Sequence, residues 1–477
     1  MYATLAAGIA LGCDAPAMAE PISQQEAEDL RREVAALKAQ LKRMEDRLGP
    51  DQPQTAAAAA PAAVVAAPAA VAAAPAAPAP VVAAAPAAAA PKEASTSILW
   101  RGSPQFGSGD RAFKVKGRIQ ADTGIVDVPR GTGDRGFGFA SEFRRIRLGG
   151  EGKLGSNFGY KLELELSDNA VDLVDTFVTY DAKPWLVTLG NQNQFQSLDE
   201  VTGDTTGSFM ERAAYTDAFN FERRLGVSVQ YQHKALLLQG GIFTDDITAL
   251  SNASDGPSGG DENNSFSIDG RIVYAPKAGD TQFHAAASAH RRKLARLTDS
   301  QVRYRQRPYL HVSNSRILAT PVLNVEEELN YGVEAAAIRG PLHAAAEGHW
   351  LEAKRPGNDT ARFFGAYAEV GYFLTKGDSR SYRGGIFGGA DPKHPLGKGG
   401  IGAVQVNLRY DYLDLNSGRI RGGTQDAYLA AIIWTPINYL RFNLNYGYLD
   451  YKGAAIPANG RTDYGAHVTG ARIELDF

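Results

Sequence analysis

Alternation of polar and apolar residues is the feature of this sequence that most restricts its fold. It runs from about residue 110 to the C-terminus and is clearest in segments 161–166, 404–412 and 440–446. Successive side chains of a β-strand point to opposite faces, so each segment predicts a strand with one polar and one apolar face. Tilted strands of this length can cross a lipid bilayer.

The lengths of the connections between these segments distinguish a membrane barrel from a soluble sandwich, whose strands show the same alternation of polar and apolar residues. Short connections fall at 155–157, 183–184, 233–234, 276–279, 340–341 and 435–437, and long ones between them at 127–140, 191–223, 244–264, 291–325, 353–360, 415–422 and 452–461. Outer-membrane barrels have short turns at one end and long loops at the other, with an apolar outer face. We therefore predict an all-β, antiparallel transmembrane barrel over residues 101–477. Segment 376–400 does not fit, because it is long where a short turn is expected.

The first nineteen residues predict a signal peptide. An apolar run at 5–11 leads to the small-x-small site Ala17-Met18-Ala19, as before a cleavage point. No basic residue precedes this run, so we expect translation to begin upstream of Met1. Cys13 lies within the signal, and its removal would leave the mature protein without cysteine; lipid attachment to Cys13 is the alternative.

Residues 20–49 predict a coiled-coil helix. Apolar residues recur there at spacings of four and three, namely Leu30, Val34, Leu37, Leu41, Met44 and Leu48. Such a short helix is marginal alone and is expected to associate with copies of itself, unless it lies against its own barrel. Residues 50–100 are rich in Ala, Pro and Val and predict a disordered, extended linker, since recurring proline prevents a continuous helix.

The last strand predicts recognition by the barrel-assembly machinery of the outer membrane. Ala471, Ile473 and Leu475 share one face with Phe477, which ends the chain, while charged residues occupy the other face. An alternating last strand with a terminal aromatic residue resembles the signal that this machinery reads. We therefore expect the protein in the outer membrane of a Gram-negative bacterium, with its N-terminal segment in the periplasm.

Three stretches resemble the phosphate-selective porin O and P family. They are FRRIRLGGEGK at 143–153, FMER at 209–212 with DAF at 217–219 and RRLG at 223–226, and GYFLT at 371–375 with 400–415 downstream. The resemblance implies a homotrimer of barrels, each of sixteen strands, which agrees with the alternating segments. It also implies a third loop, 191–223, that folds inward, and a pore lined by arginine and lysine. The family commonly has a lysine where this chain has Asn193, which weakens the expectation of strict phosphate selectivity.

Strand parity selects the candidate pore residues. If the apolar face of each strand meets lipid, the basic residues on the other face point into the lumen, where fixed cations attract anions such as phosphate. Arg144 falls on the wrong parity, so it requires a bulge or a strand end. With the basic residues of the third loop, the candidates are Lys114, Lys116, Arg118, Arg145, Arg147, Arg212, Arg223 and Arg224. The alternative for the loop arginines is pairing with Glu211, Asp217 and Glu222, which would fix the loop against the wall.

A second basic cluster marks the external loop 291–325, which contains a single acid, Asp299. It holds Arg291, Arg292, Lys293, Arg296, Arg303, Arg305, Arg307 and Arg316. Such an outer rim would concentrate anions at the mouth of a pore. The alternative is binding of the acidic sugars of lipopolysaccharide.

Other functions are less well supported by the sequence. A formal net charge of −3 argues against a nucleic-acid partner. No Gly-x-Ser-x-Gly elbow, phosphate-binding loop or cysteine cluster is present, so we expect no enzymatic activity, no catalytic residue, no cofactor and no metal site. The remaining alternative is a structural tether, in which the N-terminal helix reaches the peptidoglycan through a linker of roughly 100 Å.

Overall fold

The computed structural model describes residues 96–167, 169–244, 247, 265–294 and 301–477. The chain divides into two units, 1–89 and 90–477, and all described residues belong to the second unit. The predicted signal peptide, the coiled coil and the linker up to residue 95 lie outside the described residues. No helix in the described ranges is long and apolar enough to span a membrane.

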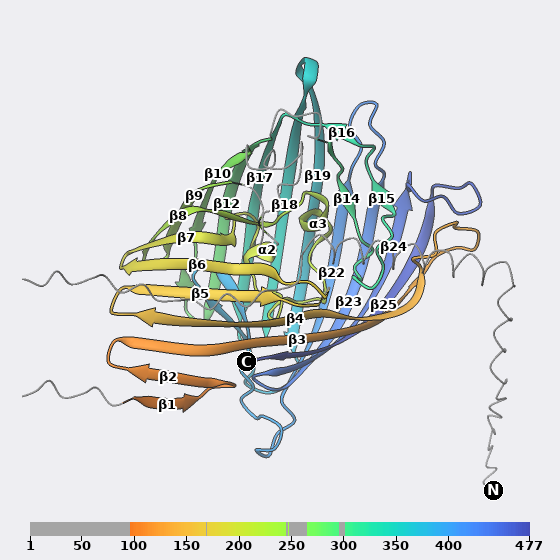
Figure 1. The fold of residues 1–477 in the computed structure, drawn as a ribbon. Coiled ribbons are helices and arrows are strands. Elements are labelled where there is room, and N and C mark those ends of the chain that lie inside the picture. Colours follow the sequence, from red (N-terminus) through yellow and green to blue (C-terminus); the bar gives the residue numbers. More distant parts are fainter. Residues whose placement is uncertain (1–95, 168, 245–246, 248–264, 295–300) are drawn as a thin grey trace, which may run out of the picture. The chain divides into compact units, whose positions relative to one another are not determined.

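The described part of the chain forms a closed antiparallel barrel of sixteen strands, as predicted (Figure 1). The barrel closes where β25 pairs with β3, from His467 opposite Asp127 to Asp476 opposite Arg118. The strands of the wall are β3 (Arg111–Asp127), β4 (Gly138–Leu154), β5 (Phe158–Glu165), β6 (Asp172–Ala182), β7 (Trp185–Asn193), β8 (Arg223–His233), β9 (Leu236–Phe243), β10 (Phe266–Tyr274), β12 (Thr281–Lys293), β17 (Glu327–Arg339), β18 (Leu342–Arg355), β19 (Asp359–Phe373), β22 (Ala403–Asp414), β23 (Thr424–Ile437), β24 (Leu440–Lys452) and β25 (Tyr464–Asp476).

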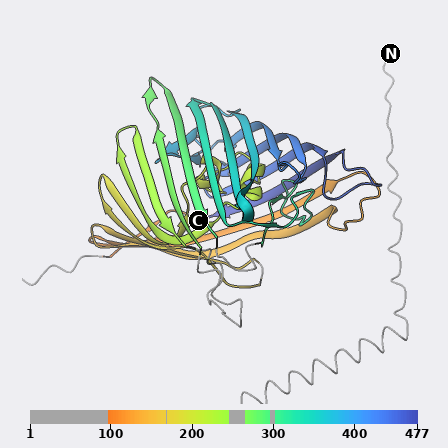
Figure 2. The ribbon, with the colours of Figure 1, turned by 90° about the horizontal axis from the view of Figure 1, so that it is seen from above.

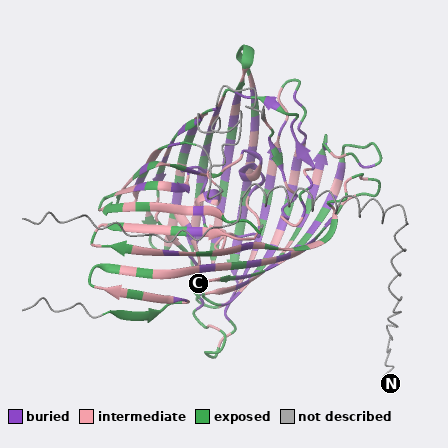
Figure 3. Cartoon of the chain, in the orientation of Figure 1, coloured by how far each residue is buried: buried purple, intermediate pink, exposed green. Residues whose placement is uncertain are grey.

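The period-two pattern of the sequence becomes an apolar outer wall and a polar lumen. On β22, Leu408 is 60% exposed, whereas its neighbours Asn407 and Arg409 are buried. On β25, Ile473 is 54% exposed between the buried Arg472 and Glu474. Bands of buried and exposed residues alternate in this way along the strands (Figure 3). Exposed aliphatic and aromatic side chains around a barrel are the surface that lipid covers.

The two ends of the barrel differ, and we call them the turn end and the loop end. Most connections at the turn end are short, such as 183–184, 340–341 and 438–439; the segment between β10 and β12 also includes β11 (Lys277–Ala278). At the loop end the connections include 194–222 and 294–326, and the shortest holds only the 3-10 helix η2 (Pro356–Asn358).

A hairpin extends the barrel wall at the turn end. Its strands β1 (Ser97–Trp100) and β2 (Pro104–Ser108) pair with each other, and β2 pairs with the first residues of β3. β1 falls within the last four residues assigned to the linker, so the disordered linker does not extend to residue 100 as expected. Three residues after the part of β3 that pairs with β2, the backbone of Gly117 exchanges hydrogen bonds of 2.9 and 3.0 Å with Phe477, which completes the pairing of β25.

Three segments of the described chain contribute side chains to the interior of the barrel, and the two short helices of the first segment lie inside the ring of strands (Figures 1 and 2). The inward loop, residues 194–222, carries helices α2 (Leu198–Val201) and α3 (Ala214–Ala218). The outer loop, described over 301–326, carries β13 (Gln301–Val302), β14 (Arg305–Gln306), β15 (Leu318–Ala319) and β16 (Leu323–Asn324). The turn hairpin, residues 374–402, carries β20 (Arg380–Arg383) and β21 (Ile386–Ala390). Their apolar side chains, including Tyr215, Leu310 and Phe387, form a hydrophobic core inside the barrel.

Candidate functional site

The inward loop crosses the lumen and is fixed to the opposite wall. The first backbone N–H groups of α2, those of Leu198 and Asp199, each donate 2.8 Å hydrogen bonds to the carboxylate of Glu347 on β18. The N–H of Ala214, at the start of α3, donates to Asp411 on β22 at 3.0 Å. Carboxylates from the wall thus accept hydrogen bonds from N–H groups that a helix start leaves unpaired.

Two buried arginines of the wall also hold this loop. Arg409 on β22 lies 2.6 Å from Glu369 and 3.2 Å from Asp199 of the loop. Arg472 on β25 binds Asp122 through two 2.7 Å hydrogen bonds and donates to the carbonyl of Met210 in the loop at 2.6 Å. Buried charges are stable only when they are paired, so these ion pairs and hydrogen bonds fix the loop firmly to the wall.

The tip of the inward loop places one carboxylate among three predicted pore arginines. Asp204 lies 2.8 Å from Arg145 and 3.8 Å from Arg147 on β4, and it also pairs with Arg118 on β3. Burial opposes ionisation of Asp204, but these arginines hold its pKa well below the usual range. Asp204 is therefore charged at neutral pH and cancels part of their positive charge.

A chamber of about 180 Å³ lies on the loop-end side of Asp204. Its described lining includes the arginines Arg144, Arg145, Arg212 and Arg307 and the carboxylates Glu200, Glu211 and Asp217, together with His311. We call it the outer chamber. Four arginines against three carboxylates give this lining an excess of positive charge.

The acids of the outer chamber differ in how readily they take up a proton. Burial raises the pKa of Glu200, which lies 3.5 Å from Arg212. Burial acts in the same direction on Glu211, but the cations of Arg144 and Arg472 outweigh it and lower the pKa of that carboxyl. Glu200 is therefore expected to lose its charge first when the pH falls.

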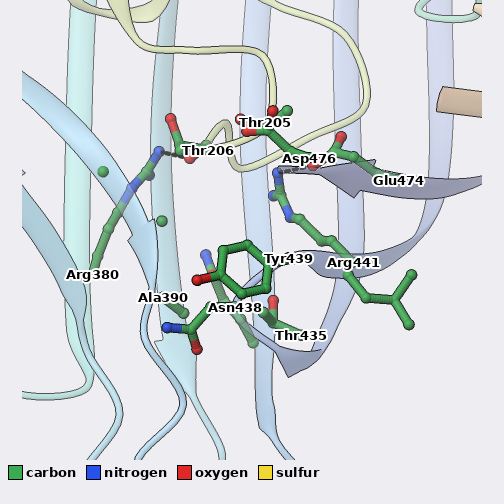
Figure 4. A pocket seen from close by; sticks show the side chains of 14 residues that line it. Thr205, Thr206, Arg380, Ala390, Thr435, Asn438, Tyr439, Arg441, Glu474 and Asp476 are labelled. Atoms are coloured by element: carbon green, nitrogen blue, oxygen red, sulfur yellow. Dashed lines mark hydrogen bonds and ion pairs between the residues drawn. The ribbon is translucent and has the colours of Figure 1, made fainter. Parts of the chain in front are cut away.

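A second chamber, of about 280 Å³, lies on the turn-end side of the inward loop (Figure 4). Arg380 of the turn hairpin stands on one side of it, and Arg441, Glu474 and Asp476 stand on the other. We call it the inner chamber. Its charges balance along the described lining, unlike those of the outer chamber. Burial lowers the pKa of Arg380 to about 10, which leaves this side chain charged at neutral pH.

Asp204 separates the two chambers. Arg145, its partner, lines the outer chamber, and Thr205, its neighbour in the chain, lines the inner chamber. Thr205 also donates a 3.3 Å hydrogen bond to Asp476 at the end of β25. The cluster of Asp204 and its arginines therefore lies between residues that line the two chambers.

A bulge explains Arg144. In the pairing of β3 with β4, Gln120 lies opposite Arg145 and Ala121 lies opposite Phe143, so Arg144 is the extra residue. Arg144 and Arg145 consequently both reach the outer chamber, although they are adjacent in the strand.

The other predicted pore residues occupy varied positions. Lys114 lines a separate hollow of about 460 Å³ on the inner face near the turn end, and Lys116 lies between Lys114 and Arg118 on the same strand. Arg223 pairs with Asp175 at 2.6 Å, close to Asn193, which is opposite it in register. The guanidinium of Arg224 contacts Glu222 at 3.3 Å.

Arg212 stabilises the inward loop by hydrogen bonds to the backbone of the same loop. Its guanidinium donates hydrogen bonds of 3.0, 2.9 and 3.1 Å to the carbonyl groups of Asp199, Glu200 and Thr202. The carboxylates named in the alternative interpretation are engaged too, but mainly by other arginines: Glu211 binds Arg144 and Arg472, and Asp217 binds Arg316.

The basic rim is partly neutralised by acids that lie outside its own loop. Arg291 lies 2.5 Å from Glu327, Arg292 lies 3.9 Å from Glu328, and Arg307 and Arg316 approach Asp217 at 3.9 and 2.7 Å. The side chains of Lys293, Arg303 and Arg305 are exposed. Arg296 and the acid Asp299 lie outside the described residues.

Parity alone would have revealed several lumen residues that the sequence analysis did not select. Arg271, Arg409, Arg441 and Arg472 each occupy the polar face of an alternating strand, and each is buried in the lumen. Arg380 is different, because it comes from the irregular segment 376–400, where no alternation guides a prediction. Among the described residues, no group of His, Cys, Asp and Glu is placed to hold a metal ion.

Comparison with known proteins gave one family, "Phosphate-selective porin O and P", which matches residues 113–477. A protein of Caulobacter vibrioides, described only as uncharacterised, is 60% identical over 483 residues, covering 100% of this chain and 96% of its own length. Among solved structures, OmpT of Vibrio cholerae is 11% identical with a TM-score of 0.49, covering 80% of this chain and 100% of its own. The anion-selective porin from Comamonas acidovorans is 13% identical with a TM-score of 0.49, covering 77% and 100%.

Proposed function

Because the chain belongs to the phosphate-selective porin O and P family, we propose that this outer-membrane porin conducts small hydrophilic solutes with a preference for anions. The family and the barrel are those of a channel rather than an enzyme. Passive diffusion requires no reacting group; it requires a water-filled passage whose fixed charges favour one kind of ion. The proposal therefore concerns which charges face the solute.

The excess of basic groups in the outer chamber is the observation that carries the proposed anion preference. Arg144, Arg145, Arg212 and Arg307 line the chamber together with His311, against three carboxylates in the described lining. Arginine suits oxyanions, because its planar fork can donate to two oxygens at once. Salt bridges to neighbouring acids reduce the net charge, so release stays fast enough for flux.

We infer a general preference for small anions rather than strict selectivity for phosphate. Asn193 stands where the family commonly has a lysine. Asp204 cancels part of the positive charge of the three arginines that it contacts. The positive and negative charges that line the inner chamber are equal in number. A site strict for phosphate would need an uncompensated cluster of donors around a single anion.

The assembly and orientation are proposals as well. We propose a homotrimer, supported by the heptad pattern of residues 20–49. The described chain begins with the β1–β2 hairpin and ends at Phe477, both at the turn end. This end is expected in the periplasm, because outer-membrane barrels place their short turns there. The N-terminal segment could then also serve as a tether to peptidoglycan without affecting conduction.

Planar-bilayer recording tests the proposed function. The purified protein is inserted under a KCl gradient, the reversal potential is read, and phosphate is then titrated. A reversal potential that favours chloride, without block by low phosphate concentrations, is the expected result. Strong block by phosphate would favour strict selectivity, and an absence of conductance would overturn the channel and leave the tether as the better account.

A further inference from the structure

The turn hairpin is a second built-in element of the lumen, and its Arg380 joins it to the inward loop. The guanidinium of Arg380 donates a 2.7 Å hydrogen bond to the hydroxyl of Ser208 and a 2.6 Å hydrogen bond to the carbonyl of Thr206. It also lies 3.5 Å from Glu369 on β19 and 4.0 Å from the ring centre of Phe387 in its own hairpin. A single buried side chain thus contacts the wall, the hairpin and the loop.

We propose that Arg380 is a positioning residue for the constriction: it holds residues 202–208 of the inward loop in place and thereby sets the width of the passage at Asp204. This inference rests on the proposed function, because it assigns a role within the pore. Asp204 lies inside the stretch that Arg380 holds, two residues before Thr206. A change in the position of this stretch therefore moves the carboxylate that faces Arg145.

The hairpin can serve as an anchor because it is itself fixed to the far wall. Tyr382 contacts the Nδ1 atom of His284 on β12 at 2.6 Å, and the carbonyl of Gly385 accepts a 3.1 Å hydrogen bond from Arg271 on β10. Arg271 in turn makes a buried pair with Glu334 at 2.6 Å. The inward loop is thus connected through Arg380 to β10 and β12, which are different strands from β18 and β22 that hold its helices.

Lysine cannot replace arginine in this positioning role. Two nitrogens of one planar group reach Ser208 and Thr206 simultaneously, while the same group remains beside Glu369. A lysine would keep the positive charge of the inner chamber but would present only one ammonium group. Replacement by lysine therefore separates two roles of Arg380, the position of the loop and the charge of the chamber.

The variants Arg380→Gln and Arg380→Lys are compared with the wild type by single-channel recording. Without the hydrogen bonds of Arg380 to Thr206 and Ser208, the stretch that contains Asp204 can shift. We therefore expect both variants to raise open-channel conductance by roughly twofold, since a constriction limits flux. Only Arg380→Gln should also shift the reversal potential. Arg383→Gln, an exposed arginine of the same strand, is the matched control and should behave as the wild type.

A disulfide provides the decisive test. A Cβ atom placed on Gly389 would lie 3.4 Å from Cγ2 of Thr206, so the hairpin and the loop touch at these two positions and a pair of cysteines there can be tested for disulfide formation. Oxidised Thr206→Cys/Gly389→Cys should return the conductance of Arg380→Gln to the wild-type value, and reduction should raise it again. Cys13 lies in the predicted signal peptide and is the chain's single cysteine, so no other thiol competes.

The outcomes distinguish the inference from the proposed function. If the folded wild type does not conduct, the proposed function itself fails. If the wild type conducts and Arg380→Gln has the same conductance, or if the disulfide does not restore it, the positioning role of Arg380 is overturned while the porin remains. Heat-modifiable mobility on gels verifies that each variant forms a barrel before it is recorded.

Discussion

The carboxylate of Asp204 lies 2.8 Å from the guanidinium of Arg145, and this pair forms the boundary between the two chambers of the barrel. One side chain comes from the tip of a loop and the other from the wall. The pair therefore joins the loop tip to the wall and sets the local charge between the two chambers. A change to either residue is expected to alter ion preference.

Asp204→Asn should increase the preference for anions. The substitution removes a negative charge from among Arg118, Arg145 and Arg147 and keeps the size of the side chain. A unit charge at about 4 Å contributes about 1 kcal/mol even in water, so we expect the chloride-to-potassium permeability ratio to rise roughly fivefold. Reversal potentials under a KCl gradient measure it. Asp280→Asn, in an exposed turn, should leave the ratio unchanged; an equal rise there would assign the effect to overall charge.

Arg144→Gln combined with Arg307→Gln should reduce the preference for anions. Both side chains line the outer chamber, and their loss leaves its carboxylates in the majority. We expect the permeability ratio to approach unity or to favour potassium, while conductance stays within about twofold of the wild type. Arg362→Gln removes an exposed arginine that pairs with Glu352 and serves as the control. Unaltered selectivity in the double variant would show that the outer chamber does not determine the ion preference.

Acidification should strengthen the preference for anions through Glu200. Burial raises the pKa of this carboxyl, so its negative charge is lost before that of Asp204 or Glu211, whose pKa values are lowered. The reversal potential should therefore move toward chloride as the pH is lowered from 7 through the raised pKa of Glu200, and less so in Glu200→Gln. An identical shift in both proteins would exclude Glu200 as the source.

The same groups affect stability with opposite signs. Glu200 binds its proton more tightly in the folded protein than in the unfolded chain, so lowering the pH through its raised pKa stabilises the fold at this site. Asp204 and Glu211 contribute stability above the usual carboxyl pKa, and this contribution is lost as the pH falls toward their lowered values. Unfolding in urea at several pH values, with Glu200→Gln as reference, separates the two contributions.

Arg472→Ala should destabilise the folded barrel strongly. Arg472 is 1% exposed and binds Asp122, Glu211 and the carbonyl of Met210. Its removal leaves the buried carboxylate of Asp122 without its arginine partner, which costs roughly 3–5 kcal/mol. Urea unfolding in lipid vesicles measures the loss, and Arg461→Ala at the exposed loop end is the control. Additional replacement of Asp122 by Ala should recover part of the loss, because one unpaired charge is then removed.

Gly117→Ala should impair assembly. The ring of Phe477 lies over this glycine, and a Cβ atom there would be 2.1 Å from Cζ of the ring. The phenylalanine must move, at a cost of roughly 1–3 kcal/mol for an overpacked site. The folded fraction, read from heat-modifiable mobility, should fall. Gly133→Ala, where no atom lies within 4 Å, should fold normally. Gly117→Ala combined with Phe477→Ala should also fold normally if the clash alone is responsible, provided that folding is measured by refolding into detergent, where the expected assembly signal at Phe477 is not needed.

The barrel could be predicted from the sequence because each strand of its wall is specified by the alternation of polar and apolar residues within that strand. Alternation on β22, β24 and β25 assigns each side chain to lipid or lumen without knowledge of its partners. Arg145 and Arg147 were placed on the lumen side by the same rule. It also required an irregularity at Arg144, and the register of β3 with β4 contains a bulge there.

The interior of the lumen could not be predicted, because its contacts join segments that are remote in the chain. Nothing near Arg472 in the sequence indicates that Asp122 and Met210 are its partners. The turn hairpin shows no alternation of polar and apolar residues, and its role depends on contacts with the inward loop, which precedes it by more than a hundred residues. Partial neutralisation of the basic rim by Glu327 and Glu328 likewise depends on strand pairing rather than on loop composition.

Attachment of the inward loop to β18, β22 and β25 has a consequence for biogenesis. These strands are synthesised after the loop, and β25 is the last of all. Until they are in place, Leu198, Ala214 and Met210 lack the groups that hold them across the barrel. Closure of the wall and fixation of the loop across the lumen are therefore expected to occur in one event.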